Sequence, residues 1–167
     1  MDLAIKSLRS KDVSISVDEE IATLLAILLH DIGHGPFSHS LEHSILPGVH
    51  HEDISSVLME QINIQMNGKL DLAIEIFENK YPRTFLHQLV SSQLDMDRLD
   101  YLRRDSFYTG VSEGTVGIER IIQMLNVKNN QLIVDQKGIY SVEKFLMARR
   151  FMYWQVYLHK TSIAADG

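Results

Sequence analysis

Six histidines fall in one short segment of the chain, out of eight in the whole sequence; they are His30, His34, His39, His43, His50 and His51. A single histidine at such a place is usually a partly buried imidazole bonded to a backbone carbonyl. Six of them, beginning at the end of an apolar helix, are hard to explain by packing, because a polar group desolvated without a partner costs free energy. The segment therefore predicts a site that uses imidazoles.

The sharpest feature of this segment is the dipeptide His30-Asp31. Adjacent residues of a helix point about 100° apart, but a long imidazole and a short carboxylate can still converge on one ion near a helix end. A neutral imidazole nitrogen and a carboxylate oxygen together suit a divalent transition metal better than calcium. The pair is a candidate for metal binding.

Four motifs of the chain, in order, resemble one known family: LLHDIGHGPFSHSLEH, HHEDIS, LDMDRLDYLRRDSFYTG and ARRFMYWQVYLHK. They are similar to segments of the HD-domain metal-dependent phosphohydrolases. The closest likeness is to the branch that hydrolyses deoxynucleoside triphosphates (dNTPs), which includes bacterial dGTPases and the animal SAM-and-HD-domain dNTPase. The resemblance implies an all-α HD-domain helical bundle that cleaves a dNTP to deoxynucleoside and intact triphosphate. It also implies a divalent transition metal (Mn, Fe, Zn, Ni or Co), with Mg as an additional ion left open.

The resemblance implies that a distant aspartate joins His30 and Asp31 as a metal ligand. Asp95 and Asp97 lie about 200° apart on a helix, so only one can face the ion. The resemblance selects Asp97, and helical geometry agrees, because Asp97, Tyr101 and Asp105 share one stripe at i, i+4 and i+8. We expect Asp95, like Asp100, to be a surface carboxylate.

The family also has an early histidine ligand, but no histidine precedes His30 here. The amphipathic stretch Met1 to Leu8 looks like the tail of a helix that nothing caps. We therefore expect residues 1–167 to form a single HD phosphohydrolase domain that lacks an upstream helix or helices. The alternative is a complete chain in which a water, another residue or a partner takes that position.

The catalytic imidazoles implied by the resemblance are His34 and His39, near the scissile phosphate, and His51, which Glu52 would orient. A histidine with a pKa near neutrality can give or take a proton at physiological pH. We expect Gly33 to form the sharp turn of this motif, together with Gly35.

The last predicted helix carries Arg149, Tyr153 and Tyr157 at i, i+4 and i+8, followed by Lys160. Taken alone, this is an amphipathic helix whose cationic side chains extend into water. The resemblance instead implies that Arg149, Tyr157 and Lys160 hold the triphosphate and sugar. A forked, permanently charged guanidinium suits polyphosphate oxygens.

The predicted helix around Asp97 carries further substrate-binding residues by resemblance. Tyr101 and Asp105 would line the sugar, where a ring can exclude a ribose 2′-hydroxyl and a carboxylate can accept from the 3′-hydroxyl. Arg98 matches a basic residue near the phosphates. Trp154 and Phe151 are expected in the core.

Helix dominates the expected fold, because 3 prolines and 9 glycines interrupt the chain and alternating β-branched runs are few. Ser16 and Glu19 form a capping-box pattern ahead of a helix that we expect to be buried on most sides. Asn129-Asn130 predicts one hairpin. The remaining helices are expected at about 38–46, 52–63, 71–79, 84–106, 118–125 and 141–160.

Composition limits the alternatives. The 167 residues include 16 Lys and Arg against 22 Asp and Glu, for a net charge of -6, so we expect no duplex nucleic acid as a partner. The absence of cysteine excludes disulfides, cysteine-ligated zinc and cysteine nucleophiles. The most apolar run, IATLLAILL, is too short to span a bilayer. We expect a cytoplasmic protein with a nucleotide substrate and no membrane partner, and by resemblance a homo-oligomer.

Two other functions stay open. One is an HD phosphohydrolase with a different phosphoester, such as a nucleoside monophosphate or a signalling nucleotide. The other is a non-catalytic nucleotide-binding or regulatory domain, because one metal ligand of the family is missing.

Overall fold

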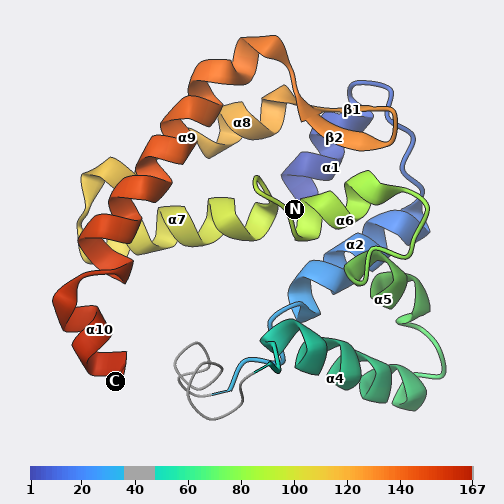
Figure 1. The fold of residues 1–167 in the computed structure, drawn as a ribbon. Coiled ribbons are helices and arrows are strands. Elements are labelled where there is room, and N and C mark those ends of the chain that lie inside the picture. The colour runs from blue at the N-terminus through green and yellow to red at the C-terminus, as the bar shows by residue number, and fades with distance from the viewer. Residues whose placement is uncertain (36–47, 167) are drawn as a thin grey trace.

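A computed structural model describes residues 1–35 and 48–166 (Figure 1). This part of the chain is helical apart from one two-stranded hairpin, which confirms the expected all-α class. The α-helices are α1 (Asp2–Arg9), α2 (Val17–Leu29), α4 (His51–Gln65), α5 (Asp71–Phe77), α6 (Thr84–Val90), α7 (Met96–Thr109), α8 (Ile118–Met124), α9 (Ile139–Met152) and α10 (Lys160–Asp166). Short 3₁₀ turns form η1 (Ser112–Gly114) and η2 (Gln136–Gly138), η3 (Tyr153–Tyr157) is a π-helical turn, and the strands are β1 (Leu125–Lys128) and β2 (Gln131–Val134).

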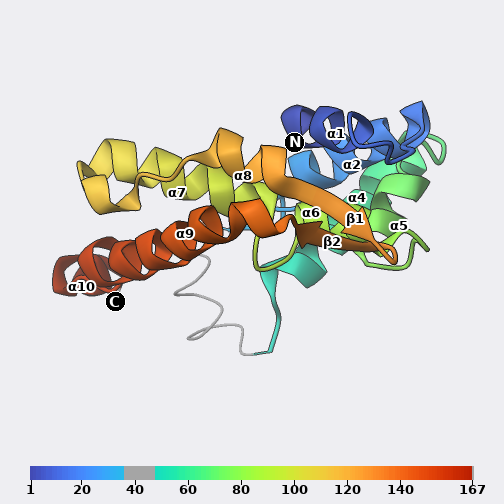
Figure 2. The ribbon, with the colours of Figure 1, turned by 90° about the horizontal axis from the view of Figure 1, so that it is seen from above.

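The helices fall into two groups that both views separate. Helices α1, α2, α4, α5 and α6 lie together on one side, and α7 to α10 extend to the other (Figures 1 and 2). One core joins the groups, and its largest fully buried side chains include Leu8, Met59, Phe85, Leu86, Leu102, Ile121 and Phe145. Among the described residues, no helix combines the length and the apolar character needed to cross a membrane.

The start of α2 confirms the predicted capping box. Ser16 Oγ accepts the Glu19 backbone N–H at 3.1 Å, and Glu19 Oε2 accepts the Ser16 backbone N–H at 2.8 Å. The Glu19 carboxylate is buried and also accepts hydrogen bonds from the Arg83 guanidinium and the Tyr81 hydroxyl. The cap therefore ties α2 to the chain ahead of α6.

The prediction that α2 is buried on most sides is wrong. Ile21 and Leu28 are 50% and 72% exposed. The buried face consists instead of small residues, Ala22, Thr23 and Ala26, and it packs mainly against α5. Small side chains let two helices approach closely, which leaves the larger leucines on the flanks.

The expected helix over 84–106 is interrupted. Helix α6 ends at Val90, and α7 begins at Met96 with Asp95 as its N-cap. Asp95 is only 3% exposed, so the expectation of a surface carboxylate is wrong. Its side chain accepts the backbone N–H groups of Arg98 and Ser92 at 2.7 and 2.8 Å, which is the usual reason for an aspartate at an N-cap.

The expected C-terminal helix also changes form. Helix α9 ends at Met152, the π-helical turn η3 follows, and α10 begins at Lys160. Trp154 is 54% exposed, so the expectation that it lies in the core is wrong. Phe151 is half-buried. A π-helical turn changes the angular spacing of side chains, and Trp154 lies under the Arg150 guanidinium at 4.3 Å from its ring centre.

The predicted hairpin is confirmed. Lys128 pairs with Gln131, so Asn129 and Asn130 form a two-residue loop. Both have positive φ, 52° and 63°, as a type I′ turn requires. The predicted helix near 38–46 lies outside the described residues.

Candidate metal centre and substrate-binding residues

The predicted metal ligands His30, Asp31 and Asp97 meet at one point, where the end of α2 faces the first turn of α7. His30 Nε2 lies 3.3 Å from Asp31 Oδ1 and 3.7 Å from Asp97 Oδ1. The other ring nitrogen, Nδ1, lies 2.7 Å from the Ile27 carbonyl oxygen. That contact orients the ring, and a proton on Nδ1 leaves the Nε2 lone pair facing the two carboxylates.

His30 Nε2 is buried and has no hydrogen-bond partner among the described residues. A buried polar atom without a partner is costly, and its neighbours here are two carboxylates. The three side chains offer ligand atoms close enough to hold one metal ion. The donor set therefore fits a divalent transition metal.

The charge of these carboxylates acts on the imidazole. Burial favours neutral His30, but the neighbouring Asp97 and Asp31 outweigh burial and raise the pKa of His30 above its ordinary value. A proton on His30 therefore offsets the two negative charges, and a cation would compete with that proton for the same nitrogen.

His34 and His51 lie against the same aspartate. His34 Nε2 is 3.4 Å from Asp31 Oδ1, and the rings of His34 and His51 stack with centres 3.9 Å apart. Asp31, His34 and His51 form a second group of ligand atoms with metal-binding spacing. The structure thus brings together two of the predicted catalytic imidazoles beside the candidate metal ligands.

Close packing between Gly33 and the start of α4 brings His51 beside His34. The Gly33 N–H donates to Ser55 Oγ at 2.9 Å, and a Cβ on Gly33 would lie 2.2 Å from the His51 carbonyl oxygen. Gly33 therefore lets α4 approach the turn after α2. Gly35 was expected to serve the same turn, but the structure gives no steric reason for a glycine there, because a Cβ would meet nothing within 4 Å.

The other two predicted catalytic residues are Glu52 and His39. The Glu52 side chain is exposed and makes no hydrogen bond or ion pair with another described residue, so the structure does not show it orienting His51. His39 lies outside the described residues.

The stripe predicted on α7 continues from Asp97 to Tyr101 and Asp105. Tyr157 in η3 donates a hydrogen bond of 2.6 Å to Asp105 Oδ2, and its ring meets that of Tyr101 edge to face at 6.3 Å. Burial and the Asp105 carboxylate raise the pKa of Tyr157 far above its ordinary value, so the hydroxyl stays a donor. Tyr101, Asp105 and Tyr157 therefore form one cluster.

The three predicted cationic substrate contacts have different surroundings. Arg98 is anchored beside Ser92 and Asp95, and the Arg149 guanidinium lies 5.7 Å from the centre of the Tyr153 ring while donating to Gln93 Oε1 at 3.3 Å. Lys160 is exposed at the start of α10 and makes no ion pair with any described residue. The contacts link Arg149 to the α6–α7 loop and leave Lys160 apart.

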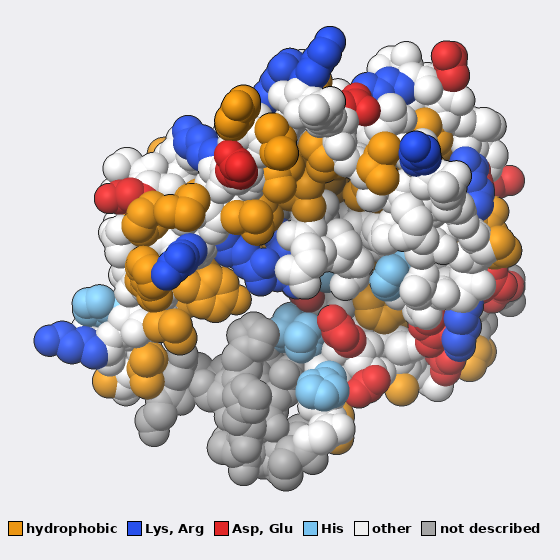
Figure 3. All heavy atoms as spheres, turned by 45° about the horizontal axis from the view of Figure 1, so that its top comes forward, with side chains coloured by type: hydrophobic (Ala, Val, Ile, Leu, Met, Phe, Trp, Pro, Cys, Tyr) orange, Lys and Arg blue, Asp and Glu red, His pale blue; other side chains and the backbone are white. Residues whose placement is uncertain are grey.

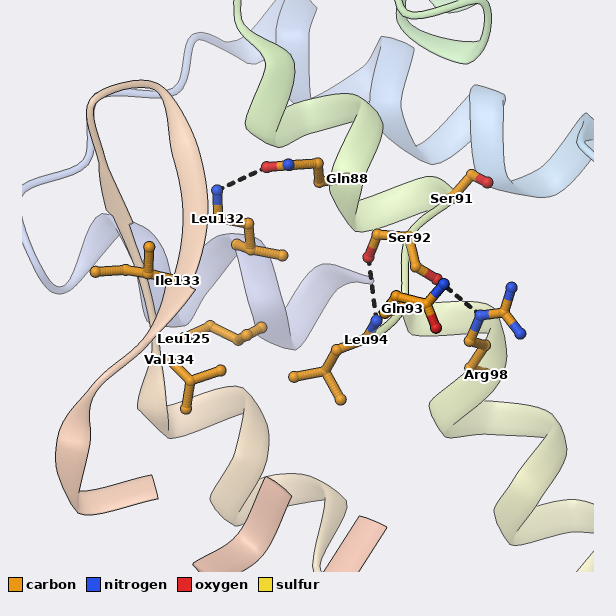
Figure 4. A pocket seen from close by; sticks show the side chains of 10 residues that line it. All are labelled: Gln88, Ser91, Ser92, Gln93, Leu94, Arg98, Leu125, Leu132, Ile133 and Val134. Carbon is orange, nitrogen blue, oxygen red and sulfur yellow. Dashed lines mark hydrogen bonds between the residues drawn. The ribbon is translucent and has the colours of Figure 1, made fainter. Parts of the chain in front are cut away.

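Surface shape agrees with this arrangement. Figure 3 shows histidine and acidic side chains together beside a hollow, with Lys and Arg side chains on another margin. A cavity of about 570 Å³ lies between the α6–α7 loop and the hairpin (Figure 4), and Arg98 forms part of its wall. None of the candidate metal ligands lines this cavity, so it is not the candidate metal site.

Gln93 is a polar residue of the cavity wall that was not predicted from the sequence. The signal that could have indicated it is its position directly before the motif LDMD.

Comparison with known proteins decides the family. The model of the HD domain matches residues 4–105, and that of an HD associated region matches residues 116–166. The chain belongs to the HD domain family. The HD model covers the candidate metal ligands and the α7 stripe, while the associated region contains Arg149, Tyr157 and Lys160.

Three proteins illustrate what this chain is similar to. A crystal structure of a phosphohydrolase from Bacteroides thetaiotaomicron is 64% identical with a TM-score of 0.95, covering 99% of this chain and 41% of its own. YwfO of Bacillus subtilis is 38% identical over 86% of this chain and 34% of its own length. The deoxynucleoside triphosphate triphosphohydrolase SAMHD1 homolog of Dictyostelium discoideum is 30% identical over 89% of this chain and 32% of its own. The chain thus spans about a third of the curated relatives' length.

Proposed function

We propose that this HD domain carries the catalytic site of a metal-dependent phosphohydrolase that converts a dNTP to deoxynucleoside and triphosphate. The observation that carries the proposal is the buried, unpartnered His30 Nε2 facing Asp31 and Asp97. Asp97 begins the stripe of α7 that continues into Tyr101 and Asp105. One helix therefore carries both a candidate metal ligand and candidate substrate contacts.

The proposed metal is held by His30, Asp31 and Asp97, with Mn, Fe, Zn, Ni and Co as candidates. When bound there, a divalent transition metal supplies Lewis-acid polarisation of a phosphoryl oxygen and of water.

Arg98 and Arg149 are the proposed triphosphate contacts, with Lys160 as the third cation. A guanidinium can bind phosphate oxygens with two parallel N–H donors, which a single ammonium cannot match. Both arginines lie near Tyr101, and their charges act on its hydroxyl. This common neighbour supports a shared role.

Asp105 and Tyr157 are the proposed sugar contacts. Their 2.6 Å hydrogen bond fixes one carboxylate oxygen of Asp105. The other oxygen can accept a hydrogen bond from a sugar hydroxyl. Tyr101 packs beside the pair, where a ring limits the room for a 2′-hydroxyl.

The proposed reaction adds one water to the α-phosphorus and breaks its bond to O5′. The oxygen of water stays on the triphosphate, and O5′ leaves with a proton to complete the deoxynucleoside. An imidazole near neutral pKa can carry that proton. We assign it to His39, as the resemblance implies, with His34 and His51 beside the metal ligands.

The relative from Dictyostelium discoideum, named a dNTP triphosphohydrolase homolog, supports the choice of substrate. The phosphohydrolase from Bacteroides thetaiotaomicron supports the reaction class. The expectation of a homo-oligomer stays a prediction, which light scattering in solution can check.

Product analysis tests the proposal. The protein is loaded with Mn²⁺ and incubated with each dNTP, and the products are separated by anion-exchange chromatography. Deoxynucleoside and triphosphate in equal amounts support it, whereas deoxynucleoside monophosphate and pyrophosphate contradict the triphosphohydrolase assignment. Release of product only from other phosphoesters would favour the wider phosphohydrolase alternative. A rise in melting temperature with dNTP and no product would favour the binding module.

A further inference from the structure

Asp95 makes contacts beyond those of a helix cap. Its Oδ1 accepts the Arg98 backbone N–H at 2.7 Å, and its Oδ2 accepts the Ser92 backbone N–H at 2.8 Å. Oδ2 also lies 3.2 Å from the side-chain Nε of Arg98. One buried carboxylate therefore contacts both the backbone and the guanidinium of the same arginine.

The Arg98 guanidinium is anchored through its Nε–H. Its Nε–H donates to the Ser92 carbonyl oxygen at 2.7 Å as well as facing Asp95. The two terminal nitrogens lie outside these hydrogen bonds, and Figure 4 shows them pointing away from the Ser92 contact. Anchoring Nε fixes the plane of the group. The terminal nitrogens lie near the Tyr101 hydroxyl, and their remaining N–H donors can bind a ligand.

Burial differs strongly between the two partners. The Asp95 side chain is 4% exposed, whereas that of Arg98 is 30% exposed. The carboxylate cannot reach a ligand, but the arginine can. A fixed side chain loses less rotamer freedom when it binds an anion than a mobile one does.

We propose that Asp95 is a positioning residue, which holds the Arg98 guanidinium in the orientation that binds the phosphates of the substrate. The phosphate part of this inference rests on the proposed function, whereas the orientation of Arg98 does not. The competing explanation is that Asp95 only caps α7. In the first explanation the Asp95 carboxylate is needed to hold Arg98 Nε, whereas in the second it serves only to accept backbone N–H groups.

The informative variant is Asp95→Asn. Asparagine is as good an N-cap as aspartate, so its Oδ1 should keep the Arg98 backbone N–H and the start of α7. The amide NH2 that replaces Oδ2 carries no charge and cannot accept from Arg98 Nε or from the Ser92 N–H. The matched control is Asp100→Asn, which removes an exposed carboxylate from the same helix, where it pairs with Arg104 and not with Arg98 among the described residues. Circular dichroism and thermal unfolding establish that both variants remain folded.

The first measurement is the order of the Arg98 side chain, from ¹⁵N relaxation of its Nε–H group by NMR, assigned with Arg98→Lys. We expect a rigid Nε–H in the wild type and in Asp100→Asn, and a mobile one in Asp95→Asn. An equally rigid Nε–H in Asp95→Asn would overturn the inference, because the Ser92 carbonyl and the Tyr101 hydroxyl would then hold the group without Asp95.

The second measurement is the Kd of inorganic triphosphate by calorimetry at fixed salt. We expect Arg98→Ala to weaken binding about 10- to 100-fold and Asp95→Asn to weaken it about three- to tenfold. In the Arg98→Ala background, Asp95→Asn should have no further effect, because it acts through Arg98. Additive losses would overturn the inference.

The two measurements separate this inference from the proposed function. A wild type that does not bind triphosphate, but whose Arg98 order depends on Asp95, would contradict the proposed substrate and leave the positioning contact standing. Triphosphate binding that Asp95→Asn leaves unchanged would support the proposed function and overturn the positioning role.

Discussion

Tyr157 donates a 2.6 Å hydrogen bond to Asp105 Oδ2, and this contact joins the π-helical turn η3 to α7. The two residues are far apart in the chain and belong to the HD associated region and the HD domain. Tyr101 packs against Tyr157 from the same stripe of α7. The sugar-binding face proposed here therefore depends on contact between the two matched regions.

Tyr157→Phe tests that contact. Removing the hydroxyl should cost about 1 kcal/mol of unfolding free energy, because the donor to a half-buried carboxylate is lost. It should also raise KM for a dNTP more than it lowers kcat, since Asp105 would no longer be fixed. Urea unfolding and steady-state kinetics measure the two effects. Tyr108→Phe is the control, because Tyr108 is 80% exposed, and it should change neither value; equal effects in both variants would contradict the role of the contact.

Asp97→Ala tests the metal group. The variant should lose bound transition metal, because one of three converging ligands is gone. Metal content per chain, measured by plasma mass spectrometry after dialysis against Mn²⁺, gives the result. Asp100→Ala should retain the metal, since Asp100 is exposed and paired with Arg104. Asp97→Ala with wild-type metal content would show that other groups hold the ion.

Gly33→Ala tests the packing that brings His51 to the site. Its Cβ would lie 2.2 Å from the His51 carbonyl oxygen and 2.5 Å from the Ser55 backbone nitrogen. Overpacking of this kind costs about 1–3 kcal/mol, so unfolding in urea should occur at lower denaturant. Gly35→Ala should stay close to the wild type, because its Cβ meets nothing within 4 Å. Similar stabilities for the two variants would mean that α4 is free to shift.

The predictable parts of the fold are those specified by local chemistry. The Ser16–Glu19 capping box and the Asn129-Asn130 turn each depend on a few neighbouring residues, and both are confirmed. The choice of Asp97 came from the family resemblance, and the spacing of side chains around one helix agreed with it. The structure places it 3.7 Å from His30.

The parts that sequence reasoning missed depend on distant partners. Asp95 was assigned to the surface because helix periodicity does not reveal an interruption at Ser91–Asp95, where side chains replace helical hydrogen bonds. The exposure of Ile21 and Leu28 could not be predicted from their apolar character, because α5 packs on the small residues of α2 instead. The spacing of Tyr153 and Tyr157 was taken from an α-helix, whereas the segment forms a π-helical turn.

Glu19→Gln gives a pH-dependent prediction. Burial acts to raise the pKa of Glu19, but the Ser16 backbone N–H, Arg83 and the Tyr81 hydroxyl outweigh it and lower the pKa below its ordinary value of 4.5. A lowered folded-state pKa stabilises the fold above the unfolded pKa, and that stability is lost as pH falls through the folded value.

Urea unfolding of wild type and Glu19→Gln across pH 3 to 7 measures this effect. The wild type should be more stable by roughly 1–3 kcal/mol near neutrality, and the difference should shrink below about pH 4.5 as Glu19 takes up a proton. Glu60→Gln, which alters an exposed carboxylate, controls for general acid effects. A difference that does not change with pH would contradict the ion pair as its source.

The most direct test of the proposed reaction is ³¹P NMR of the products formed from a dNTP and Mn²⁺-loaded protein in ¹⁸O-enriched water. We predict triphosphate with ¹⁸O on one terminal phosphorus, unlabelled deoxynucleoside, and no product from the Asp97→Ala variant. Pyrophosphate as the product, label in the deoxynucleoside, or undiminished turnover in Asp97→Ala would contradict the proposed reaction.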